Sequence, residues 1–143
     1  MAIEANKVLI QRFIDVVLNE GNTDAIDDFC LPGSMFAGGL VGQVRSMKTI
    51  FPDLHHTVEY MICEGDRVAV RVKSEGTNTG PMVGMPAFGR LEKPVPPTGV
   101  TVVSNAIYIF KVVDGKIISY SAEIDQIGML RQMGWTFTPP ASG

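Results

Sequence analysis

Two carboxylates stand two residues apart near the end of the chain, Glu123 and Asp125, and they are the first candidates for acid–base chemistry. Alternation along a strand places both on one face with Ser119 and Ser121. If that face lines a cavity, repulsion between the carboxylates raises the pKa of one, and a carboxyl group in an apolar pocket can both take and give a proton. If it faces water, as one face of an antiparallel sheet usually does, both are surface acids. Asp125 can also cap the helix that follows it.

Two basic side chains extend this set. Arg71 can stabilise an enolate or bind a substrate carboxylate, or it can form a surface ion pair with Glu59 or Glu75. His56 stands where an alternating strand expects an apolar residue, so it is either a general acid–base in a pocket or a packed core histidine. The predicted catalytic residues are Asp125, Glu123, Arg71 and His56.

Further polar and apolar residues could bind a substrate. Asn105 and Tyr108 lie on one long strand and could each donate a hydrogen bond to an oxyanion, but their opposite parity lets only one face a cavity unless the strand has a bulge. Tyr60 is a similar candidate, and for all three the alternative is packing with the polar tip at a rim. The methionines suit an adaptable pocket lining. The predicted substrate-binding residues are Asn105, Tyr108, Tyr60, Phe36, Met35 and Met85.

Hydrophobic spacing predicts the elements that must position these residues. Apolar residues at 10, 13, 14 and 17 form one face of a helix that ends at Gly21, and shorter helical patterns follow. Two later segments, 54–62 and 68–73, alternate with period two. A long apolar strand over 100–113 follows, and Asp114-Gly115 predicts a hairpin turn to a return strand over 116–124. The Gly- and Pro-rich stretch 76–99 is predicted to be loop, and a short helix ends at Gly134.

This order of elements predicts an α+β fold. The N-terminal helices would pack on one face of a strongly curved antiparallel or mixed sheet that encloses a pocket, and that pocket is the expected functional site. We expect a single domain over residues 1–138 and a flexible C-terminal tail over 139–143.

Composition excludes several classes of protein. The chain has 143 residues, 45% of them hydrophobic, and a net charge of −3, which argues against disorder and against nucleic-acid or membrane binding. No apolar run reaches the roughly 18 residues of a membrane span, and no signal-peptide pattern opens the chain. Cys30 and Cys63 lack metal-ligand spacing, and two thiols are favoured over a disulfide. We therefore expect a cytoplasmic protein without a metal, haem, flavin or nucleotide cofactor.

Several short segments together resemble the SnoaL-like polyketide cyclases. They are 6–22, 51–54, 64–71, 76–80, 84–86, 114–117 and 125–134, in order over nearly the whole chain. The resemblance implies the cone fold of the nuclear transport factor 2-like (NTF2-like) superfamily and a homodimer. The family includes cofactor-independent aldol cyclases of aromatic polyketide pathways, isomerases and hydroxylase-like relatives, while limonene epoxide hydrolases and ketosteroid isomerases share its fold.

The resemblance also bears on individual residues. Asp125 matches the acid that ends the last strand, and Arg71 matches a recurring arginine. In the epoxide hydrolase relatives that arginine belongs to an Arg-x-Asp pair, but Lys73 replaces the Asp here. The family's early strand, which ends in a His-Asp-like pair, corresponds to 31–39, a stretch without histidine or acid, so that wall of the pocket is expected to be apolar. The loop 92–97 is longer than in the family and is either a lid at the rim or a solvated insertion.

We predict a cofactor-independent enzyme that acts on a hydrophobic small molecule. It would close a ring by an intramolecular aldol-type step, or isomerise a carbonyl-containing natural-product intermediate, in an apolar cavity. Asp125 would be the acid–base, assisted by Glu123 or His56, and Arg71 or Asn105 would stabilise the oxyanion. Two alternatives stay open: epoxide opening or shape-controlled cyclisation in the same fold, and a non-catalytic ligand-binding dimeric module.

Overall fold

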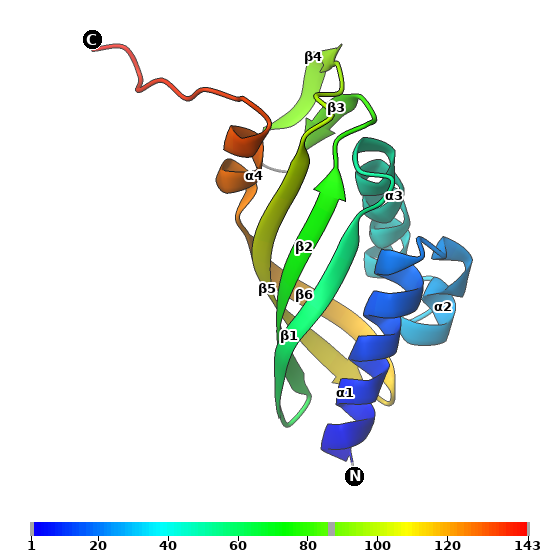
Figure 1. Ribbon diagram of the computed structural model, residues 1–143. Coiled ribbons are helices and arrows are strands. Elements are labelled where there is room, and N and C mark those ends of the chain that lie inside the picture. The colour runs from blue at the N-terminus through cyan, green and yellow to red at the C-terminus, as the bar shows by residue number, and fades with distance from the viewer. Residues whose placement is uncertain (1, 86–87, 143) are drawn as a thin grey trace.

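The computed structural model describes residues 2–85 and 88–142, and its elements are labelled in Figure 1. Helices come first and strands follow, as the sequence predicts. The helical elements are α1 (Ala2–Phe13), the π-helix η1 (Ile14–Asn19), the 3-10 helix η2 (Thr23–Ala25), α2 (Ile26–Phe29), α3 (Met35–Ile50) and α4 (Gln126–Gln132). The strands are β1 (His55–Glu64), β2 (Arg67–Thr77), β3 (Met82–Met85), β4 (Gly89–Val95), β5 (Thr101–Val113) and β6 (Lys116–Ile124).

Four strands form an antiparallel sheet in the order β1-β2-β5-β6, and β3 and β4 form a separate hairpin. Figure 1 shows α1 and α3 along one side of the curved sheet, with the β3–β4 hairpin beyond one end. We call the side covered by these helices the inner face and the opposite side the outer face. No helix in the described ranges is long and apolar enough to cross a membrane.

The main core fills the space between the inner face and the helices. The predicted apolar helix face is confirmed, because its four residues are each at most 1% exposed: Ile10, Phe13, Ile14 and Val17. They join a cluster with alternate residues of β2 and β5, including Val68, Val70, Val72, Ala106 and Phe110. Burying one such side chain contributes roughly 1.5–3 kcal/mol, so this layer holds α1 and η1 against the sheet.

The segment Gly76-Thr77-Asn78-Thr79-Gly80 joins the end of α3 to the sheet. The Asn78 side chain is buried and donates to the carbonyls of Ile50 and Gly80, while its Oδ1 accepts from both the backbone and the hydroxyl of Thr98. A Cβ at Gly80 would lie 1.7 Å from the Thr49 carbonyl oxygen, so only glycine fits there. This glycine-rich stretch therefore has a structural role: it lets the chain after β2 pack closely against the end of α3.

The structure differs from the predicted elements in three places. The stretch 76–99 is not all loop, because it holds the end of β2 and the β3–β4 hairpin. In unbroken alternation Tyr60 and Ile62 would lie on the face of His56 and Val58, but β1 has a bulge between Val58 and Tyr60 that moves them to the outer face. Cys30 makes a single bridge to Ile117 just before the stretch 31–39 that corresponds to the family's early strand, and this stretch then begins α3 with Ser34 as its N-cap.

Candidate functional site

A cavity of about 60 Å³ lies on the inner face, beneath α3. Its walls are mostly apolar and include Phe13, Leu40, Val44 and Phe110. Its polar groups come from four elements of the fold: Gln43 and Lys48 from α3, His56 from β1, Tyr108 from β5 and Tyr120 from β6. The cavity therefore offers an imidazole, an ammonium, an amide and two phenols in an otherwise apolar space.

His56 is half-buried, and its ring is held from one side. Its Nδ1 lies 2.6 Å from the hydroxyl of Ser74, which is directly opposite on β2. Burial, followed by the charges of Lys48 and His55, lowers the pKa of His56 from 6.5 to about 4. The imidazole is thus neutral near pH 7, and it can either accept or donate a proton through Nε2, depending on its tautomer.

Tyr108 and Tyr120 form an aromatic wall next to this imidazole. Tyr108 stacks on Phe110 with ring centroids 5.8 Å apart and meets Tyr120 edge-on at 5.4 Å. Burial raises the pKa of Tyr108 well above its usual value, so its phenol stays protonated and can only donate to an oxyanion. The Tyr120 hydroxyl donates to Gln43 Oε1 at 2.8 Å.

A wider groove of about 760 Å³ adjoins the cavity. It lies between α3, the β3–β4 hairpin and the start of α4, and Gln43 and Met47 line both hollows. Its walls are mostly apolar, and Met85, a predicted substrate-binding residue, is one of them. A hollow of several hundred Å³ suits an organic molecule, so the groove can take the body of a ligand whose tip enters the small cavity.

Most of the predicted catalytic residues lie on the outer face instead. Arg71, Asn105, Glu123 and Asp125 line one shallow hollow there, so the structure brings them together but not with His56. Glu123 and Asp125 are exposed, as expected for the alternative in which their face of the sheet points to water. The Asp125 carboxylate caps α4 by accepting from the Gly128 N–H at 2.8 Å. Arg71 Nε lies 3.2 Å from Glu59 Oε1, as in the surface ion pair considered above.

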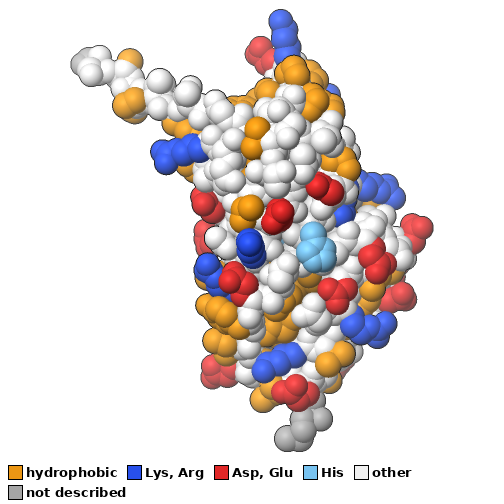
Figure 2. Space-filling view, in the orientation of Figure 1, with side chains coloured by type: hydrophobic (Ala, Val, Ile, Leu, Met, Phe, Trp, Pro, Cys, Tyr) orange, Lys and Arg blue, Asp and Glu red, His pale blue; other side chains and the backbone are white. Residues whose placement is uncertain are grey.

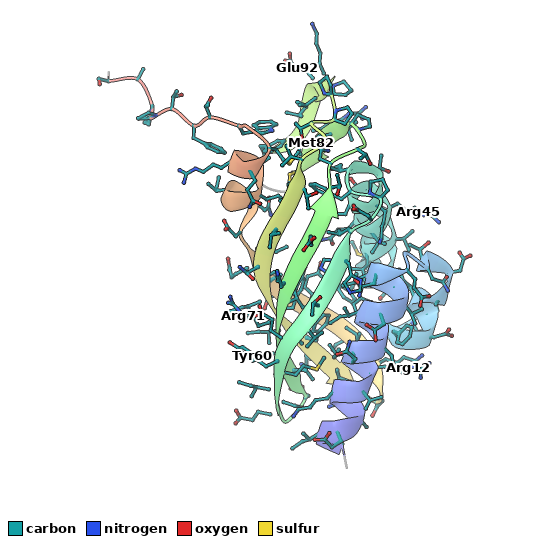
Figure 3. All side chains as sticks on the ribbon, viewed as in Figure 1. Arg12, Arg45, Tyr60, Arg71, Met82 and Glu92 are labelled. Carbon is teal, nitrogen blue, oxygen red and sulfur yellow. The ribbon has the colours of Figure 1, made fainter. Side chains whose placement is uncertain are left out.

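The predicted substrate-binding residues divide between several surfaces. Tyr108 faces the cavity, so Asn105, which has the opposite parity, faces outward. In Figure 3 the labelled Tyr60 and Arg71 project from the side of the sheet opposite α1, and Tyr60 is 57% exposed. Phe36 packs edge-on against Tyr120, while Met35 is 96% exposed at the start of α3. Loop residues 92–95 belong to β4, and they do not line the cavity or the groove.

Sequence reasoning did not single out Lys48, Gln43, Ser74 or Tyr120 as site residues. Tyr120 has the opposite parity to Glu123 on its strand, and that parity was the available signal, since the face of Tyr120 lines the cavity. Lys48 and Gln43 border the apolar stripe of α3, where polar residues usually face solvent. Among the described residues, no cluster of His, Cys, Asp or Glu could hold a metal ion, and Cys30 and Cys63 are free.

Comparisons with known proteins agree with this architecture. The sequence profile of the SnoaL-like polyketide cyclases matches residues 8–133. Aklanonic acid methyl ester cyclase DauD from Streptomyces sp. (strain C5) is 27% identical over an alignment that covers 92% of this chain and 83% of that protein.

Solved structures share the fold at low sequence identity. TsrD from Streptomyces laurentii superposes with a TM-score of 0.74 at 24% identity, covering 92% of this chain and 96% of that one. A protein from Jannaschia sp. CCS1 assigned as a SnoaL-like polyketide cyclase gives 0.76 at 23% identity, covering 96% and 94%. IdmH from Streptomyces antibioticus, assigned as a polyketide cyclase, gives 0.71 at 22% identity, covering 90% and 98%. The α+β NTF2-like cone expected from the sequence is therefore confirmed.

Proposed function

This chain belongs to the SnoaL-like polyketide cyclase family, and from that premise we propose that it is a cofactor-independent enzyme that closes a ring, or isomerises a double bond, next to a carbonyl group. The observation that carries the proposal is the pairing of a neutral, oriented imidazole with a protonated phenol in one apolar cavity. Its substrate is a hydrophobic natural-product intermediate whose body lies in the wider groove and whose carbonyl end enters the cavity.

The reaction needs one proton taken from carbon and one given to oxygen. In the tautomer with hydrogen on Nδ1, the Ser74 oxygen accepts that hydrogen and the Nε2 lone pair of His56 takes a proton from the carbon beside the carbonyl. The electron pair of the broken C–H bond forms an enolate, whose oxygen accepts a hydrogen bond from the Tyr108 hydroxyl. Attack of the enolate carbon on a second carbonyl closes the ring, and the His56 imidazolium then protonates the resulting alkoxide.

The low proton affinity of His56 limits the substrates. A weakly basic imidazole removes only an already acidic proton, such as one on a carbon between two carbonyl groups. The same weak basicity makes the imidazolium a strong acid, which favours protonation of the alkoxide. Substrates of the β-dicarbonyl type therefore fit the site better than simple ketones.

Aklanonic acid methyl ester, the compound named for the relative DauD, is the first substrate to test. We expect the wild-type protein to cyclise it or to exchange the activated hydrogens of a cyclic β-keto ester for deuterium in D₂O. His56→Gln should lower the rate by about 100-fold or more, and Tyr108→Phe by about tenfold or more. Wild-type rates in a correctly folded His56→Gln variant, or a wild-type protein inactive in both assays, would contradict the proposal.

A binding role without catalysis is the second candidate. It is favoured by the position of Asp125 and Arg71, the groups assigned to catalysis by resemblance, on the outer face. In that case the protein would bind the same apolar carbonyl compounds, which titration calorimetry detects, but neither cyclise them nor exchange their hydrogens. The assays above therefore separate the two candidates.

We also propose that the protein is a cytoplasmic homodimer joined through the outer face. Tyr60, Ile62, Ile107 and Ile109 are each more than 40% exposed there, and Figure 2 shows hydrophobic side chains between charged ones over the sheet. Arg71 and Lys73 lie on β2, whereas Glu123 lies on β6. A two-fold axis that sets β2 of one copy near β6 of the other would bury the apolar side chains and pair opposite charges.

A further inference from the structure

The first helical segment ends in a π-helix that brings one side chain to β1. In η1 (Ile14–Asn19) the backbone hydrogen bonds span more residues than in an α-helix. The Glu20 N–H donates to the Asp15 carbonyl at 3.1 Å, and the Asn22 N–H donates to the Val16 carbonyl at 3.1 Å. Short π-helical segments in proteins often occur at functional sites. Here the last residue of the segment, Asn19, is half-buried, and its amide reaches the start of β1.

The Asn19 side chain binds both backbone groups of His56, the N–H and the carbonyl. Its Oδ1 accepts from the His56 N–H at 2.7 Å, and its Nδ2 donates to the His56 carbonyl at 3.0 Å. Asn19 thus takes the place of a neighbouring strand at the edge of the sheet. Because both backbone groups of His56 point to Asn19, they point away from β2, and His56 and Ser74 form a non-hydrogen-bonded pair. Side chains approach most closely in such pairs, in agreement with the 2.6 Å contact between Nδ1 and the Ser74 hydroxyl.

Lys48 joins the same region from α3. Its ammonium donates to the Asn19 carbonyl at 2.5 Å and to the Leu54 carbonyl at 2.7 Å, so it ties the end of η1 to the chain just before β1. Its aliphatic stem packs along Gly21, where φ is +70°. One side chain therefore fixes both the residue that holds His56 and the residue that leads into β1.

We propose that Asn19 and Lys48 are positioning residues for His56: Asn19 fixes the place of its backbone, and Lys48 holds Asn19 and places a positive charge near the imidazole. This inference rests on the proposed function in its use of His56 as the proton acceptor. Neither residue needs to touch the substrate to act in this way, although Lys48 borders the cavity.

The charged groups around His56 give the sign of the effect. Lys48 on α3 and His55 on β1 each disfavour the imidazolium, whereas Tyr108 on β5 is neutral, and none of the described residues that line the cavity carries a carboxylate. Asp53 acts on Lys48, because its charge raises the pKa of that ammonium against the lowering caused by burial. Removing the Lys48 charge should therefore raise the pKa of His56 and move the acidic limb of the pH–rate profile to higher pH.

The test compares charge with geometry. Lys48→Gln keeps a donor but removes the charge, Lys48→Arg keeps the charge, and Lys93→Gln, at an exposed position on β4, is the matched control. Because the chain has only two histidines, an NMR titration can follow the His56 ring with His55 as the internal reference. We expect Lys48→Gln to raise the pKa of His56 by about half a unit or more, with Lys48→Arg and Lys93→Gln close to wild type.

Asn19→Ala tests the geometric part. It should speed hydrogen exchange of the His56 amide by about tenfold or more and lower kcat with little change in KM, without moving the acidic limb. Asn19→Asp is the second variant: it keeps the acceptor for the His56 N–H and adds a negative charge, so it should raise the pKa of His56. An unchanged His56 titration in folded Lys48→Gln, or unchanged amide exchange in folded Asn19→Ala, would overturn the inference.

These two NMR measurements need no substrate. If they succeed while every variant and the wild type lack turnover, the positioning network stands and the proposed enzymatic function fails. If turnover depends on His56 but not on Asn19 or Lys48, the proposed function stands and this inference fails.

Discussion

The imidazole Nδ1 of His56 lies 2.6 Å from the hydroxyl of Ser74, on neighbouring strands of the inner face. This contact orients the ring and makes Ser74 the partner that selects its tautomer. We therefore expect Ser74→Ala to lower kcat by about tenfold with a smaller change in KM, because the ring loses its orientation but the groove is unaltered. Steady-state kinetics on a folded variant measures this, with Ser121→Ala on the outer face as the control. Equal kcat values would show that Ser74 has only a packing role.

The stability of the fold should depend on pH through His56. Its pKa is 6.5 when unfolded and about 4 when folded, so between these values the unfolded chain binds more protons. The free energy of unfolding should then fall as pH drops from about 6.5 to about 4, by up to roughly 3 kcal/mol, and show no further His56 contribution below that range. Urea unfolding of wild type and His56→Gln across this range isolates the difference from carboxylate titration. Parallel curves for the two proteins would contradict it.

Asn78 should matter for stability far more than an exposed asparagine does. Asn78→Ala leaves the carbonyls of Ile50 and Gly80 and the N–H of Thr98 without their side-chain partner, which should cost about 2–4 kcal/mol. Asn105→Ala on the outer face should cost less than about 0.5 kcal/mol. Denaturant titrations compare the two, and similar midpoints would argue that water replaces the buried bonds.

The outer face should control the oligomeric state. Ile107 is 43% exposed between the charged residues of that face, and Ile107→Asp would place a desolvated carboxylate in the proposed interface. We expect light scattering to show a wild-type dimer and an Ile107→Asp monomer at the same micromolar concentration. Val8→Asp, at an exposed position on α1, serves as the control and should stay dimeric. A monomeric wild type would remove the dimer proposal.

Asp125 separates the resemblance-based assignment from the geometric one. If its role is to cap α4, Asp125→Asn should keep both stability and turnover, while Asp125→Ala should lose about 1 kcal/mol of stability. If Asp125 is the acid–base, Asp125→Asn should lose turnover by orders of magnitude with the fold intact. Thermal unfolding and kinetics on the two variants decide between these roles.

The elements that depend on local spacing could be predicted from the sequence. The apolar helix face of Ile10 and Phe13 follows from the 3.6-residue period, and Asp114-Gly115 takes the positive φ angles, 49° and 72°, of the expected hairpin turn. The β3–β4 hairpin was missed because its Gly and Pro content hides the alternation. The bulge in β1 was missed because an extra residue in a strand changes no residue type, only the partner that each residue faces.

The candidate site was only partly predictable for the same reason. His56 and Tyr108 follow from a polar side chain on the apolar side of a strand. Gln43 and Lys48 join the site because the fold brings α3 next to strands that are distant in the sequence, and a local sequence pattern does not contain that information. The polar outer cluster around Asp125 is a real cluster, but parity alone could not tell which face of the sheet it occupies.

The bulge in β1 gives the strand two phases. Before it, even-numbered residues such as His56 face the helices; after it, odd-numbered residues such as Met61 do, and Tyr60 and Ile62 are released to the other side. Glu59 is the residue left without a partner in this register. Its deletion would leave Val58 facing inward and Tyr60 outward in unbroken alternation, so His56 and Met61 would both stay on the inner face. The extra residue therefore sets the local bend and twist of β1, and a loss of one codon there would straighten the strand without moving His56, Met61 or Tyr60 to the other face.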